Sequence, residues 1–263
     1  MKPNVLPIAF SNSGVRLEEV LNLLRTEPPQ EKVYGFICLM YRRLAAGALL
    51  MDGDPTRFFE YLFKSARAYT HFLDIAPPRE KVTSRVEAFY DAVACHDDEA
   101  ARRMAVAAPS LMSREHEYEE DFFAIRLLMD RFFGSGNAAT LRASLDQWAK
   151  LAEDNPDPRL AVCRPLIEGD QEGFDAGVDA YIRDRKKRLT KLRETEELDP
   201  DEASTTAHVS TELLAWIDLA ERAGLRVKRD HPFAPALARA FNRLAPPAPD
   251  SWQIPEPFSA FDE

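Results

Sequence analysis

The sequence predicts an all-α fold, an irregular array of antiparallel helical hairpins followed by an extended, proline-rich C-terminal tail. Three features of the chain indicate this fold class. Apolar residues recur at three- and four-residue steps over long segments, glycines number only 10, and many of the 19 prolines stand at the joints between those segments. Proline lacks an amide donor and biases the residue before it away from helix, so each joint ends one helix before the next begins.

Proline-rich joints divide the chain into the expected helices. Pro28-Pro29 and Pro77-Pro78 stand between apolar-periodic segments, as does Pro156 with Pro158. A short joint between two helices places them antiparallel, which makes the hairpin the expected unit. We expect helices near residues 16–26, 31–51, 55–74, 79–95, 98–107, 115–133, 138–153, 158–168, 171–195, 205–223 and 233–244.

The segment 115–133 shows the helical periodicity most clearly. Its large apolar residues recur at three- and four-residue steps, which places them on one face of a helix. Acidic residues lie off this stripe, so we expect an amphipathic helix with an acidic outer side. The apolar stripe consists of Tyr118, Phe122, Ile125, Met129 and Phe132, and the acidic side includes Glu117, Glu120 and Asp121.

A recurring turn marks the start of three expected helices. Asp54, Asp97 and Asp170 each follow the end of one helix, where a side-chain oxygen can accept hydrogen bonds from the first free amides of the next helix. Gly53 and Gly169 supply a permissive residue before two of these turns. The aspartates are 43 and 73 residues apart. The array is therefore similar in appearance to tetratricopeptide hairpins but is not a strict repeat, which has a period of about 34 residues.

The chain is expected to form a single helical domain over residues 1–244, and residues 245–263 form a C-terminal strap or tail. Prolines are frequent in this tail, which excludes a continuous helix. Trp252, Ile254, Phe258 and Phe261 favour a docked strap, because large apolar side chains are more often buried than left in water.

The composition is that of an ordinary globular protein. At 263 residues, with 45% hydrophobic and 30% charged residues, the chain can bury a sizeable core. No uninterrupted apolar stretch approaches the roughly 18 residues of a membrane helix. The apolar run near the N-terminus is broken by Pro3 and Pro7 and is too short for a signal peptide. We therefore expect a cytoplasmic protein without a membrane partner.

The net charge and the cysteine content argue against a nucleic-acid ligand and against a disulfide or zinc framework. The formal net charge of −10 argues against nucleic acid as a direct ligand, because phosphate binding needs a surplus of Lys and Arg on the contacting face. Cys38, Cys95 and Cys163 are odd in number and far apart. We expect them to be core residues rather than parts of a disulfide framework or a zinc cluster.

No segment carries a recognisable catalytic, metal or cofactor-binding motif. The G-x-S-x-G, Walker and G-x-G-x-x-G patterns are absent. His116 and Glu120 share a helix face, but two ligands are too few for zinc. Asp52 and Asp54 begin like a calcium loop, yet its twelfth position is Phe63 rather than an acidic ligand. We therefore predict no catalytic residue, no metal and no cofactor.

A basic run in the segment 171–195 is the one feature that points towards nucleic acid. An acidic stretch follows the basic run at once. Leu189 and Leu192 are expected on the buried side of the same helix. We interpret this segment as a solvated, salt-bridged helix. The basic residues are Arg183, Arg185, Lys186, Lys187 and Arg188, and the acidic ones are Glu194, Glu196, Glu197, Asp199, Asp201 and Glu202.

Four segments, taken in order and spacing, carry a resemblance to a known family. They are Ala88-Phe89-Tyr90-Asp91-Ala92-Val93 through His96-Asp97 into Ala100-Ala101, then residues 118–123, then residues 166–174, and finally residues 216–224 with His231-Pro232-Phe233-Ala234-Pro235-Ala236-Leu237. From about residue 30 to about residue 240, this pattern resembles the immunity protein 49 family, all-helical antitoxins encoded beside polymorphic toxins in bacteria. The similarity is thin from about Asp184 to His208.

The resemblance implies a stoichiometric inhibitor, not an enzyme, that binds and occludes a cognate toxin domain, often a nuclease. An acidic protein facing a basic nuclease gains association rate and specificity from complementary charge. On that view the candidate partner-binding residues are acidic, and ordinary solvation is the alternative for all of them. The first group is Glu117, Glu119, Glu120 and Asp121, and the second is Glu194, Glu196 and Glu197.

A second function class is compatible with the same features. A helical-hairpin scaffold can act as an adaptor or chaperone that binds peptide segments of protein partners in a concave groove. An adaptor would capture several peptides, whereas an immunity protein would bind one toxin. An enzyme without a recognisable motif is the third alternative.

Overall fold

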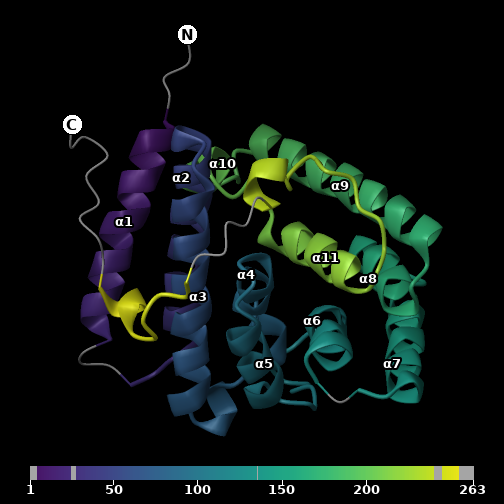
Figure 1. Ribbon diagram of the computed structural model, residues 1–263. Helices are drawn as coiled ribbons and strands as arrows, with labels where there is room; N and C mark the ends of the chain where they lie inside the picture. The colour runs from purple at the N-terminus through teal and green to yellow at the C-terminus, as the bar shows by residue number, and fades with distance from the viewer. Residues whose placement is uncertain (1–4, 25–27, 135, 240–244, 255–263) are drawn as a thin grey trace.

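The structure is a computed structural model of the chain, and it describes residues 5–24, 28–134, 136–239 and 245–254. Over these residues the fold is all-α, with short 3₁₀ turns and no strand, which confirms the fold class expected from the sequence (Figure 1). The α-helices are α1 (Leu6–Leu23), α2 (Glu31–Asp52), α3 (Pro55–Ile75), α4 (Ala88–Ala94), α5 (Asp98–Ala107), α6 (Glu119–Phe132), α7 (Ala138–Leu151), α8 (Pro158–Glu168), α9 (Gln171–Glu194), α10 (Pro200–Ser204) and α11 (Thr211–Arg222).

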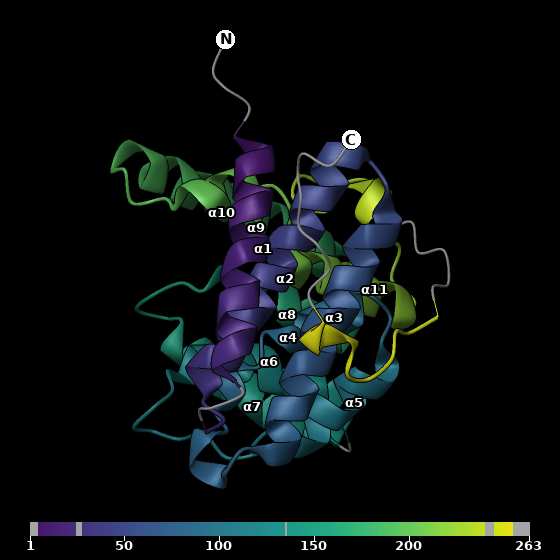
Figure 2. The ribbon, with the colours of Figure 1, turned by 90° about the vertical axis from the view of Figure 1, so that its left-hand side faces the viewer.

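Three long helices, α1, α2 and α3, lie side by side at the N-terminal side of the molecule (Figures 1 and 2). Tyr34, Ile37, Tyr41 and Leu44 recur at three- and four-residue steps along α2 and are all buried. By length and composition alone α2 could cross a membrane, but 67% of its apolar window is buried inside the protein. Such burial is what the core helix of a helical array shows.

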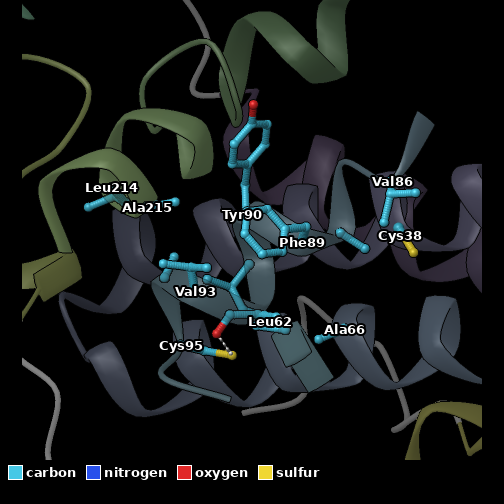
Figure 3. Packing of buried hydrophobic residues seen from close by; sticks show 14 of the residues in the cluster. Cys38, Leu62, Ala66, Val86, Phe89, Tyr90, Val93, Cys95, Leu214 and Ala215 are labelled. Carbon is cyan, nitrogen blue, oxygen red and sulfur yellow. Dashed lines mark hydrogen bonds between the residues drawn. The ribbon is translucent and has the colours of Figure 1, made fainter. Parts of the chain in front are cut away.

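The short helix α4 lies at the centre of the core. All seven of its residues are buried, which is possible because α3 packs on one side and α11 on another. Figure 3 shows Phe89 and Val93 of α4 among Leu62 of α3 and Leu214 of α11. Most of the buried apolar residues of the described chain form one continuous cluster from α1 to α11.

The cysteines and the predicted helix caps are confirmed. Cys38, Cys95 and Cys163 are all free and buried. The side chains of Asp54, Asp97 and Asp170 each accept a hydrogen bond from a backbone amide in the first turn of the next helix, at 2.8, 3.0 and 3.1 Å. Each carboxylate therefore satisfies one of the amides that a helix start leaves free. Ahead of two of them, glycines 53 and 169 adopt left-handed backbone with φ of 67° and 76°.

Two helix boundaries in the first third of the chain were predicted wrongly. Helix α1 begins at Leu6 rather than near residue 16, because Pro7 lies in the first turn, where its missing amide costs nothing. The segment 79–95 is not one helix: 3₁₀ turns at Pro78–Glu80 and Thr83–Arg85 precede α4. Thr83, which is buried, donates its hydroxyl to the carbonyl of Pro109 at 2.7 Å, and this contact holds the segment out of helix.

The apolar stripe of α6 is shorter than predicted. Phe122, Ile125 and Met129 are buried as expected, but Tyr118 is 75% exposed. Helix α6 begins at Glu119, and Tyr118 precedes it in extended backbone. Tyr118 is therefore not part of the buried apolar face of α6 that the sequence predicted.

Two boundaries near the C-terminus also differ. Helix α11 begins at Thr211 rather than near residue 205, because Ser210 caps it by accepting a hydrogen bond from the amide of Leu213 at 3.2 Å. In place of the helix expected over 233–244, the structure has a 3₁₀ turn at Ala236–Arg239, and residues 240–244 lie outside the described part.

One residue of the C-terminal tail is docked on the helices. Trp252 is 2% exposed, and its ring packs near Tyr34 of α2 and His71 of α3. Its carbonyl accepts a hydrogen bond from the hydroxyl of Tyr41. Ile254 is 66% exposed. Phe258 and Phe261, which the predicted strap also includes, lie outside the described residues.

Candidate functional site: a central polar cleft

A cleft of about 890 Å³ opens between helices from both ends of the chain. Its lining residues come mainly from α2, α4, α6, α7 and α8 and from α9, α11 and the segment before α11. Many of the lining residues are charged. They are the arginines Arg42, Arg159, Arg185 and Arg188, and the carboxylates Glu87, Glu120, Asp121, Asp157, Asp184, Glu202 and Glu212.

Glu212 forms a hydrogen-bonded group at the cleft with Tyr181 and Ser210. The hydroxyl of Tyr181 in α9 donates to Oε2 of Glu212 at 2.6 Å and lies 3.4 Å from Oγ of Ser210. Burial raises the pKa of the Glu212 carboxyl, and the hydrogen bond from Tyr181 acts in the opposite direction. A carboxylate is thus held in a half-buried place where its charge costs free energy.

Arg159 is fully engaged within the protein. Its guanidinium contacts Asp157 at 2.8 Å and Asp121 at 2.7 Å. Asp157 also accepts a hydrogen bond from the indole of Trp148 at 3.2 Å and caps α8. The positive charge of Arg159 is therefore offset by two carboxylates that line the same cleft.

Arg42 of α2 is engaged in the same way. It contacts Glu87 at 2.6 Å and the fully buried Asp91 at 3.1 Å. The guanidinium of Arg42 lowers the pKa of Glu87. Burial raises the pKa of Asp91, and Arg42 together with a 2.6 Å hydrogen bond from Ser65 opposes that rise. This network joins α2, α3 and α4 beneath the cleft.

Four carboxylates of the cleft have no ion pair with any described residue. They differ from Glu87, Asp121 and Asp157, each of which contacts an arginine. The lining therefore carries an excess of negative charge that the chain itself does not neutralise. These carboxylates, called the unpaired carboxylates below, are Glu120, Asp184, Glu202 and Glu212.

The residues of the first predicted acidic group have different surroundings in the structure. Glu117 accepts hydrogen bonds from the backbone amides of Ser84 and Ser113, both at 2.7 Å, so it fixes a loop. Glu120 and Asp121 line the cleft. Glu119 is half-buried at the start of α6 and is not among the lining residues.

The second predicted acidic group lies elsewhere. Glu194 is the last residue of α9, and Glu196 and Glu197 follow it. All three are exposed, and none lines the cleft. They stay predicted partner contacts on a separate surface.

The basic run of α9 is solvated but not salt-bridged. Arg183, Lys186, Lys187 and Arg188 are exposed and form no ion pair with the described residues, which corrects the expectation of a salt-bridged helix. Arg185 instead donates to the carbonyl of Thr206 at 2.8 Å and lies over the ring of Phe233 at 5.2 Å. Leu189 is buried beneath the run, as predicted.

Sequence reasoning did not find Tyr181, Ser210 or Glu212. Tyr181 and Glu212 are 31 residues apart, and each has the spacing of an ordinary helical residue. Only Ser210 carried a local signal, since Ser before an apolar run is a typical helix cap.

Together these features define a class of protein: an all-α scaffold that presents unpaired carboxylates in an open cleft, as expected of a protein that binds a partner. Residues 42–238 match the family described as Immunity protein 49. The match covers most of the chain, and the chain belongs to this family, as its sequence pattern suggested. No curated protein and no solved structure matches the chain. Immunity proteins bind and neutralise a cognate toxin, and they are generally not enzymes.

Proposed function

We propose that this protein neutralises one cognate toxin domain by binding it at the central cleft and occluding the surface that the toxin needs for its activity. The family match carries the proposal. It spans residues 42–238 and includes every cleft-lining residue except Leu39. The cleft is thus built almost entirely from the part of the chain that defines the family.

The toxin we propose is a basic nuclease, and the place of action is the cytoplasm. The support is charge: the chain has a formal net charge of −10, and the cleft holds the unpaired carboxylates. Enzymes that act on nucleic acid present basic surfaces, and complementary charge accelerates association and selects the partner. An immunity protein of this kind protects the cell that makes a polymorphic toxin during competition between bacteria.

Co-expression with the neighbouring toxin tests this function. The toxin domain is encoded beside the immunity gene in systems of this type, and cells that express it alone should die. We expect co-expression of this protein to restore growth and the two proteins to copurify in equal amounts. A toxin domain of unrelated sequence but the same activity is the control, and it should remain lethal. Lethality of both domains, with no complex formed, would contradict the proposal.

A further inference from the structure

The cleft does not neutralise its own charge. Arg159 and Arg42 are held by carboxylates at 2.6 to 2.8 Å. Arg185 is turned towards the carbonyl of Thr206 and the ring of Phe233. Arg185 and Arg188 both line the cleft without an ion pair among the described residues, against four unpaired carboxylates. A cation fits this lining better than an anion does.

Among the described residues, Glu212 is the one unpaired carboxylate whose side chain accepts a hydrogen bond. Tyr181 fixes its Oε2 from α9, and its Oε1 has no hydrogen-bond partner among the described residues. The capped start of α11 fixes its backbone, since Ser210 binds the amide of Leu213. One carboxylate oxygen is therefore positioned and available to a ligand.

A bound cation would offset the free-energy cost of keeping the Glu212 carboxylate half-buried. A half-buried carboxylate loses part of its hydration, and a partner charge restores the lost interaction more strongly there than in open water. Tyr90, whose hydroxyl extends from α4 away from Leu62 and Cys95, lines the same cleft with Leu39 and Ile125 (Figure 3). Such apolar and aromatic walls suit the aliphatic stem of a long basic side chain.

We infer that the cleft receives an arginine or lysine side chain from a protruding segment of the toxin, and that its cationic head pairs with Oε1 of Glu212. This inference rests on the proposed function, because the occupant is part of the cognate toxin. The other unpaired carboxylates line the same cleft. The toxin is held by a basic residue that it cannot then present to its own substrate.

Isothermal calorimetry with a catalytically inactive form of the toxin domain tests this inference. Glu212→Gln keeps the shape and the hydrogen bond from Tyr181 but removes the charge, and we expect the Kd to rise at least about tenfold. Glu19→Gln is the matched control, because Glu19 of α1 is exposed, lies outside the cleft and is not a predicted partner contact. Its Kd should stay within about twofold of the wild-type value.

A double-mutant cycle identifies the occupant. Each exposed Arg and Lys of the toxin domain is replaced by Ala and measured against wild type and Glu212→Gln. One toxin cation should lose its effect when Glu212 is already Gln, while the others keep theirs. If Glu212→Gln is poorly folded by circular dichroism, Tyr181→Phe replaces it, since it frees the Glu212 carboxylate while leaving its charge.

The outcomes separate this inference from the proposed function. Tight wild-type binding that Glu212→Gln and Tyr181→Phe leave unchanged would overturn the inference and leave the immunity function standing. Coupling of Glu212 or Arg188 to an acidic toxin residue would overturn it as well. Failure of the wild-type protein to bind the toxin at all would instead contradict the proposed function.

Discussion

The hydroxyl of Tyr181 donates a 2.6 Å hydrogen bond to Oε2 of Glu212, and this bond joins α9 to α11 at the cleft. Neither residue has a role in a local turn or in a helix cap. Tyr181 is held in place by Trp216 of α11, whose ring centroid is 4.7 Å away in an edge-to-face arrangement. The positions of both helices therefore decide whether the carboxylate is presented to a partner.

Replacing Glu212 by Gln should stabilise the free protein at neutral pH. The pKa of Glu212 is raised in the folded state, chiefly by burial and also by Glu87, while Tyr181, Arg159 and Arg185 lower it. The folded protein then binds the proton more tightly than the unfolded chain does, so Glu212 lowers stability as pH rises above its unfolded pKa of about 4.3.

Thermal unfolding of wild type and Glu212→Gln from pH 3 to pH 8 measures this effect. We expect the variant to have the higher Tm at pH 7 and the difference to vanish below about pH 4. Together with weaker toxin binding, this result would mark a residue kept for function at a cost in stability. A variant less stable than wild type at pH 7 would contradict the account.

Replacing Gly177 by Ala should separate α8 from α9 and disturb the cleft. A Cβ at Gly177 would lie 2.0 Å from the carbonyl oxygen of Ala161 and 3.0 Å from the amide of Val162, and neither backbone atom can move freely. Tyr181 stands one turn further along α9. We expect a loss of about 3 kcal/mol in the free energy of unfolding, as overpacked cores show, together with weaker toxin binding.

Gly35→Ala in α2 is the control for this change. Its Cβ would meet only the end of the Glu31 side chain, at 3.1 Å, and no backbone atom. Because Ala also favours helix, urea unfolding should show a free energy within about 1 kcal/mol of wild type. Equal losses of unfolding free energy for Gly177→Ala and Gly35→Ala would contradict close packing of α8 against α9.

Asp97 should contribute more to the free energy of unfolding than Asp170 does. Asp97 is 2% exposed and, besides capping α5, contacts the guanidinium of Arg67 at 2.8 Å. Asp97→Ala leaves a buried arginine without its main partner, which costs about 4 kcal/mol, whereas Asp170→Ala removes an exposed cap worth about 1 kcal/mol. Urea unfolding of both variants checks the order, and a smaller loss for Asp97→Ala would contradict it.

Arg42→Met should destabilise the core beneath the cleft. It leaves the fully buried Asp91 with the hydroxyl of Ser65 but without a counter-charge. Breaking one partner of a buried ion pair costs about 3 to 5 kcal/mol. Arg79→Met is the control, since the side chain of Arg79 is 85% exposed. Guanidinium unfolding that shows equal stability for the two variants would exclude this role for Arg42.

Local patterns predicted much of the fold. The caps at Asp54, Asp97 and Asp170 were predictable because a cap depends on residues within one turn of each other. Most helix ranges followed from apolar periodicity and proline joints. Periodicity failed where tertiary contacts decide the backbone, as at Thr83, whose hydroxyl binds the carbonyl of Pro109, 26 residues away.

The cleft could not be predicted from the same patterns. Its groups meet over separations of 31 residues for Tyr181 and Glu212 and 38 for Arg159 and Asp121. A helical pattern separates buried from exposed faces, but a polar residue beside a cleft has the pattern of one facing open solvent. Of the acidic residues predicted to bind the partner, Glu120 and Asp121 alone line the cleft.

Blocking the cleft tests whether the toxin docks there. Leu151 lines the cleft and is 37% exposed, so Leu151→Trp can fill part of the opening without entering the core. Leu111 is 82% exposed and does not line the cleft, which makes Leu111→Trp the matched control. In calorimetric titrations with the inactive toxin domain, we expect Leu151→Trp to raise the Kd at least about tenfold and Leu111→Trp to leave it unchanged. Unchanged binding by a folded Leu151→Trp variant would contradict docking at the cleft.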